Sequence, residues 1–133
     1  MGQQQRLLLI LSSIVVGFAI IAGMQLATSY DAKANEDALR TDILFIAARA
    51  QEWYRKPKML GGGGRTFSGL KLADLHFPKK NDNGIFSVPT SPQKTQFEII
   101  AIGKTDNDND DTPLKLVAVI GVDSVKSITV TSR

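Results

Sequence analysis

The sequence predicts an α+β fold in which one long N-terminal helix packs against a small C-terminal antiparallel β-sheet. Three observations lead to this prediction. An uncharged apolar stretch runs from Leu7 to Thr28, the segment 29–56 has apolar residues at helical spacing without Pro or Gly, and four short apolar runs follow residue 83. We therefore divide the chain into a hydrophobic half-helix (1–28), an amphipathic half-helix (29–56) and a β-rich globular head (57–133).

The apolar stretch is long enough to cross a membrane. At about 1.5 Å per residue it spans about 33 Å, compared with about 30 Å for the hydrocarbon core of a bilayer. A secretory signal peptide has an apolar region of only about 7–15 residues, so we expect this segment to be retained. Arg6 is the only charged residue before the stretch. The positive-inside tendency predicts that the N-terminus stays cytoplasmic and that the head crosses the membrane.

The second segment continues the helix as an amphipathic one. Its apolar residues recur at spacings of three and four and mark one face, formed by Leu39, Ile43, Ile46, Ala47, Ala50, Trp53 and Tyr54. Oppositely charged residues pair at helical spacing, Glu36 with Arg40 and Arg49 with Glu52. Pro57 and the glycines after it end the pattern. We predict one continuous helix from about Gln4 to Lys56, about 80 Å long.

The head is expected to be a four-stranded meander. Its apolar runs cover residues 84–88, 96–103, 114–121 and 126–131, separated by turns. Because a small sheet needs a partner to be stable, one face should pack on the stripe from Leu39 to Trp53. We expect this face to bury Phe97, Ile99, Leu116 and Val130 or their alternates. Gly61–Gly64 lack the Gly-Lys-Ser/Thr ending of a phosphate loop, and we interpret them as a flexible reversal out of the helix.

Composition limits the classes of function. The chain has no cysteine, which excludes disulfides and thiol chemistry. About 100 residues beyond the apolar stretch suffice for one small domain. The net charge is +3, with Lys and Arg scattered along the chain, so no nucleic acid is expected as a partner. His76 is the only histidine, and we expect a loop or packing role for it. No serine nucleophile motif accompanies it, so we do not expect an enzyme.

One polar segment, 105–112, has the composition of a calcium loop. Asp106, Asp108 and Asp110 alternate with asparagines there, and these side chains supply the hard oxygens that calcium prefers. The segment does not match the EF-hand pattern, which has glycine at its sixth position and glutamate at its twelfth. The alternative is a solvated hairpin turn, because Asp and Asn favour turns. We expect no other cofactor.

The order of these parts resembles the type IV pilin superfamily. A short polar start, Met1–Gln5, leads into about twenty apolar residues, an amphipathic half-helix and a β-rich head. The resemblance implies a subunit that waits in the inner membrane and is stacked by a pilus assembly machinery into an extracellular filament of itself. The expected self-assembly residues are Gln5, Leu8, Ile14, Gly17, Ile20 and Gly23.

The sequence also departs from the family pattern. Gln5 stands where family members usually carry a glutamate, and no proline interrupts the apolar helix. The family's processing step would need a leader before Met1 or cleavage after Gly2. Two alternatives stay open: a pseudopilin or minor pilin of a secretion system, and a single-pass anchor that presents an extracytoplasmic binding domain.

Overall fold

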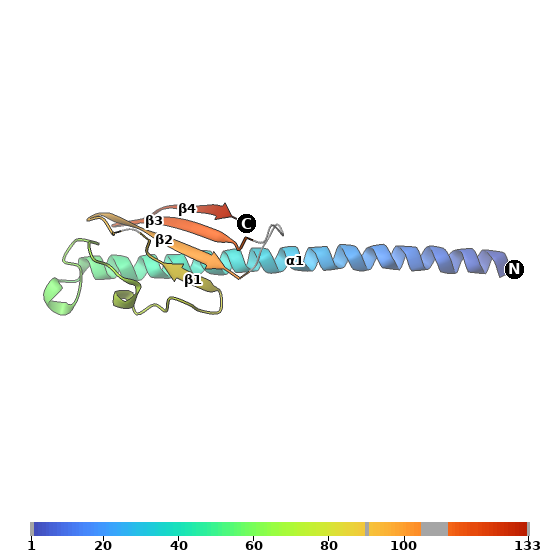
Figure 1. Cartoon of the computed structure of the whole chain (residues 1–133), viewed down its shortest axis with the longest axis horizontal. Helices are drawn as coiled ribbons and strands as arrows, with labels where there is room; N and C mark the ends of the chain where they lie inside the picture. The colour runs from blue at the N-terminus through green and yellow to red at the C-terminus, as the bar shows by residue number, and fades with distance from the viewer. Residues whose placement is uncertain (1, 90, 105–111, 133) are drawn as a thin grey trace.

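The computed structural model describes residues 2–89, 91–104 and 112–132. One helix, α1 (Gly2–Arg55), extends over 54 residues without a break, and Figure 1 shows it as a straight rod whose C-terminal half lies against the rest of the chain. At about 1.5 Å per residue the rod is about 80 Å long. The predicted continuity of the two half-helices is therefore confirmed, and the helix ends two residues before Pro57.

Four strands form one antiparallel sheet in the order β1-β2-β3-β4. Their bounds are β1 (Gly84–Ser87), β2 (Gln96–Gly103), β3 (Lys115–Gly121) and β4 (Val125–Ser132). Because each strand pairs with the next one along the chain, the sheet is the predicted meander. Two short 3₁₀ helices, η1 (Lys58–Leu60) and η2 (Leu72–Leu75), precede the sheet.

The core lies between α1 and one face of the sheet. On α1, Leu39, Ile43 and Ile46 are fully buried. The sheet contributes alternating residues to the same cluster: Phe86, Phe97, Ile99, Ala101, Leu116, Ala118 and Ile120. This alternation confirms the predicted burial of Phe97, Ile99 and Leu116, while Val130 is partly buried at the edge of the cluster. The amphipathic half of α1 thus supplies the partner that the sheet needs.

The glycines after α1 form a hydrogen-bonded cap, which corrects our interpretation of a flexible reversal. The backbone N–H of Gly63 donates to the carbonyl of Trp53 (2.8 Å), that of Gly64 to Lys56 (3.0 Å) and that of Arg65 to Tyr54 (2.8 Å). These bonds satisfy carbonyls that the last turn of a helix leaves without partners. The chain returns so closely over the helix end that only glycine fits at position 63.

Aromatic side chains link this cap to the sheet. The ring of Tyr54 lies 4.8 Å from that of Phe67, and Phe67 lies 5.0 Å from Phe97, as centroid distances. Trp53 packs against the glycine cap and the edge of the core. Trp53 and Tyr54 therefore both have a packing role, as expected, although Phe67 lies between Tyr54 and the sheet.

One predicted ion pair forms and the other does not. Arg40 binds Glu36 at 2.8 Å. Arg49 instead donates from Nη1 to the carbonyls of Leu75 (2.8 Å) and His76 (3.2 Å) at the end of η2. The pairing of Arg49 with Glu52 was wrong because the carbonyls at the end of a 3₁₀ helix lie within reach of the guanidinium and need donors.

Candidate assembly surface

The N-terminal half of α1 has no partner in the described part of the chain. Its most apolar 18-residue window has a mean hydropathy of 2.6 and is 0% buried. Leu8, Ile14 and Ile20 are 62%, 50% and 57% exposed, which is close to what an isolated helix allows. Such a surface is not stable in water. A membrane anchor is consistent with it, and so is a bundle of like helices.

The side-chain hydroxyls in and next to this half-helix are satisfied within the helix. The hydroxyls of Ser12 and Ser13 donate to the carbonyls of Leu8 (2.7 Å) and Leu9 (2.9 Å), one turn earlier. Thr28 and Ser29 bind back to Gln25 in the same way. The side-chain hydroxyls therefore need no partner from outside, whether lipid or protein surrounds the helix.

The expected self-assembly residues do not share one face of α1. Gln5, Leu8, Ile14, Gly17, Ile20 and Gly23 are separated by three residues or by six. A step of three residues falls about 60° short of a full turn, so the row winds once around the helix between its two ends. A Cβ at Gly17 or Gly23 would meet no atom within 4 Å. A helix that contacts neighbours on several sides would use such a row, whereas a two-helix contact would use only part of it.

A second exposed apolar surface lies on the amphipathic half of α1 and was missed in the sequence. Leu44 and Phe45 are 52% and 49% exposed on the side of α1 turned away from the sheet, next to the exposed Ala48. Arg49 lies over the ring of Phe45 at 4.5 Å, and Phe77 lies 6.3 Å from it. The signal was available as a second set of apolar positions, 44, 45 and 48, beside the buried stripe. α1 therefore has exposed apolar side chains on its amphipathic half as well as on its N-terminal half.

No further chemical site emerges from the described residues. The predicted calcium ligands Asp106, Asp108 and Asp110 lie outside them, and within them no group of three or more His, Asp or Glu is placed to hold a metal. His76 is exposed and ends η2 with a left-handed φ of 53°. It lines an open hollow with Arg49, Glu52 and Asp74, and it occupies a loop, as expected.

The architecture is consistent with a pilin-like protein: a long N-terminal apolar helix continues into a head that carries a small antiparallel sheet. Comparisons with protein-family models, with curated proteins and with solved structures give no match.

Proposed function

We propose that this chain is a structural subunit of a type IV pilus-like filament. Before assembly, the apolar half of α1 anchors the subunit in the inner membrane. An assembly machinery then polymerises it through α1 into a filament outside the cell. The main support is that α1 is a single unbroken helix with two roles. Its apolar N-terminal half, residues 2–28, which we call the stalk, is entirely unburied, and its C-terminal half supplies one side of the buried core of the head. Its role is assembly, and the proposal requires no catalytic residue.

The continuity of α1 distinguishes this reading from a simple anchor. A plain anchor needs only a span and a linker, and a flexible linker would serve it. Here the stalk and the head share one rod with no Pro or Gly between residues 24 and 56. No flexible segment therefore separates the stalk from the head, and the orientation of the stalk fixes the orientation of the head. A helical polymer needs this property, because each head must keep a fixed position relative to its own stalk.

In the proposed filament, stalks replace lipid as each other's apolar surroundings. The row that winds around α1 suits a central bundle in which every stalk has several neighbours. Gly17 and Gly23 would allow close approach of two helices, as small residues do in membrane helix pairs. Gln5 would bring a neutral amide into the bundle, which can accept a hydrogen bond and avoids the cost of an unpaired buried carboxylate. Leu44 and Phe45 would add contacts between neighbouring subunits along the amphipathic half of α1.

The second candidate is a single-pass anchor, favoured by the match between the length of the apolar stretch and a bilayer. A pseudopilin or minor pilin that forms only short stubs belongs with the first proposal, because it uses the same contacts.

The test is to shear cells that make the protein, pellet the released material and image it by electron microscopy. Mass spectrometry of the fibres identifies the chain and its first residue. We expect thin fibres composed of this chain. Its complete retention in the membrane fraction, with no fibres, would favour the anchor or a stub-forming pseudopilin.

A further inference from the structure

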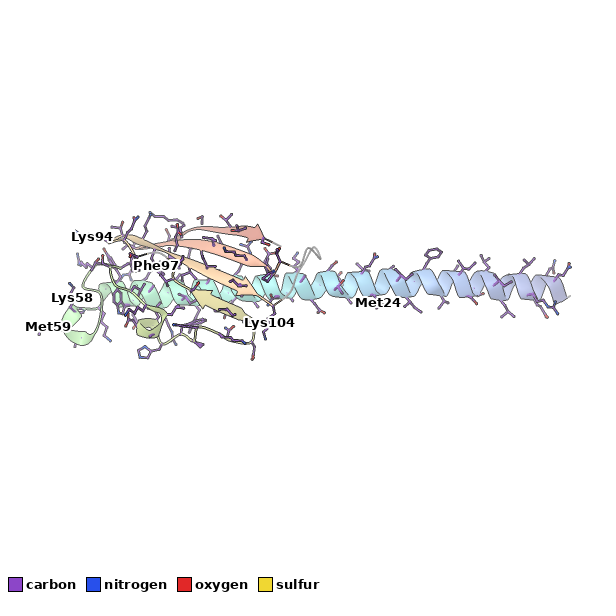
Figure 2. The ribbon with its side chains drawn as sticks, in the orientation of Figure 1. Met24, Lys58, Met59, Lys94, Phe97 and Lys104 are labelled. Atoms are coloured by element: carbon purple, nitrogen blue, oxygen red, sulfur yellow. The ribbon has the colours of Figure 1, made fainter. Side chains whose placement is uncertain are left out.

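The end of the head farthest from the stalk carries an exposed apolar pair. Met59 and Leu60 on η1 are 97% and 67% exposed. Figure 2 shows Met59 at the extreme end of the molecule, opposite the N-terminus of α1. Leu44 and Phe45 on α1 and Ile85 on β1, the other exposed large apolar residues in the described part of the chain beyond residue 30, are only about half exposed. Met59 and Leu60 therefore form a distinct feature, which we call the distal tip.

The backbone holds the distal tip in its exposed position. The N–H of Leu60 donates to the carbonyl of Pro57 (3.0 Å), that of Gly61 to Lys58 (3.0 Å) and that of Gly62 to Pro57 (3.1 Å). The glycine cap then fastens the returning chain to the end of α1. Because the first bonds order the turn and the cap ties the chain after it to α1, the exposure of Met59 follows from the fold.

Basic side chains gather at the end of the head that carries the distal tip. Lys56 and Lys58 precede the tip in sequence and are exposed, and the side chain of Lys58 passes over Gly64. Figure 2 places Lys94 at the same end as Lys58 and Met59. Arg55 and Arg65 line one nearby hollow. Three acidic groups lie at this end as well: Asp123 binds Arg55 at 3.3 Å, and Glu52 and Asp74 line the hollow that includes Arg49, Lys56 and Leu60. Positive charge therefore exceeds negative charge at this end.

We propose that the distal tip docks onto an anionic lipid surface. Protruding apolar side chains with Lys and Arg at the same end of the head suit a membrane interface, because the apolar groups enter the acyl boundary while the cations remain among the headgroups. Met59 protrudes from the protein, and no groove of the described head shapes the surface around it. A fluid acyl layer can adapt to such a side chain. An acidic polypeptide would account for the cations and leave the exposed apolar pair without a role.

The lipid must belong to a second surface. The part of α1 beyond the apolar stretch places the distal tip about 40 Å from the membrane that holds the stalk, at about 1.5 Å per residue. The anchoring bilayer is therefore out of reach while α1 stands upright. The inference does not depend on filament formation, since one anchored subunit has the same tip, although an array would strengthen binding by multivalency.

Vesicle tethering tests this proposal with the full chain. The protein is inserted through α1 into phosphatidylcholine vesicles, and heads facing outward are quantified by proteolysis. Labelled second vesicles, made of phosphatidylcholine alone or with phosphatidylglycerol, are added, and their co-flotation is measured. We expect tethering only of the anionic vesicles, and weaker tethering as salt rises. The double variants Met59→Ser/Leu60→Ser and Lys56→Gln/Lys58→Gln should each reduce it about tenfold.

Matched controls address the nature of the contact. Ile85→Ser removes an exposed apolar group from β1, and Lys104→Gln removes a cation from the stalk end of the head (Figure 2), so both should tether like the parent chain. Proteolytic removal of the heads should abolish tethering. Equal capture of neutral vesicles, or full tethering by the Met59→Ser/Leu60→Ser variant, would overturn the proposal. Binding of poly-glutamate without any tethering would overturn it in favour of an acidic polypeptide.

Discussion

Gly63 is one of the glycines of the head that leave no room for a side chain. A Cβ at this residue would overlap the carbonyl oxygen of Thr66 and the indole ring of Trp53. Its N–H also caps the carbonyl of Trp53. Gly63 therefore lies where the glycine cap meets the last turn of α1 and the ring of Trp53, and it has no room for a side chain.

We predict that Gly63→Ala destabilises the head by about 1–3 kcal/mol, the usual cost of forcing extra volume into a packed site. Unfolding of the full chain in detergent, followed through the fluorescence of the single tryptophan, Trp53, measures this change. Gly61→Asn is the matched control. Gly61 has a φ of 82° with open space around its Cβ position, and Asn tolerates the left-handed region. A loss at position 61 equal to that at 63 would contradict the argument.

Asp42 joins α1 to the loop before β1. Its Oδ2 accepts hydrogen bonds from the side-chain amides of Asn81 (2.8 Å) and Asn83 (2.7 Å). Asn35 binds the carbonyl of Asn83 at 2.8 Å and strengthens the same junction. The loop is thus held to the helix by polar contacts at the side of the head nearest the stalk.

We predict that Asp42→Ala lowers the free energy of unfolding by about 2 kcal/mol, because two amides lose a charged acceptor. Denaturant unfolding measures the loss. Asp37→Ala removes an exposed carboxylate on the same helix and should change stability by less than about 0.5 kcal/mol. If the two variants lose equal stability, net charge rather than the hydrogen bonds explains the effect.

At the scale of elements, α1 stabilises the head through one face only. Ile43 is fully buried against the sheet, whereas its neighbour Leu44 is 52% exposed. We predict that Ile43→Ala costs about 2–5 kcal/mol, since it leaves a cavity between helix and sheet. Leu44→Ala should cost far less. Thermal unfolding of both variants in detergent compares them, and similar losses would mean that the head buries α1 on both sides.

The long elements were predictable because their patterns are strong. The apolar stretch is an unbroken uncharged run of membrane-spanning length, and the stripe beginning at Leu39 follows the period of a helix. Alternation located the strands within one or two residues. The Arg49 contact was not predictable, because its acceptors lie 26 and 27 residues away and depend on the fold. The glycine cap was missed for a related reason: composition identifies glycine, and only the structure shows what fills the space beside it.

The candidate assembly surface was predictable only in part. The length of the apolar stretch reveals an unpartnered surface, but it carries no information on which side meets a neighbour. The roles of Gln5 and Gly17 in assembly therefore stay predictions. Leu44 and Phe45 were missed because apolar residues beside a buried stripe look like its margin, and their exposure became evident only once the sheet was placed.

At the scale of the whole molecule, filament and anchor place different demands on the same stalk. A bilayer surrounds a single helix with lipid that adapts to its shape, whereas a helical bundle surrounds it with fixed neighbours. A membrane span tolerates an exchange of one apolar side chain for another of different shape. A bundle does not, because packing at close contacts fixes the register of each subunit.

We therefore predict that Ile14→Lys abolishes filaments and leaves the head folded. A charge near the middle of the apolar stretch costs about 2.5–3.5 kcal/mol even in a membrane, and a bundle repeats that cost in every subunit. Sheared fractions measure filaments, and Trp53 fluorescence in detergent measures folding of the head. Gly23→Leu is the sharper variant: it keeps the stalk apolar, so an anchor should still insert, while a bundle loses its close approach. Normal fibres from both variants would exclude α1 as the filament core. If Gly23→Leu inserts fully into the membrane but forms no fibres, the result would favour the bundle over the anchor.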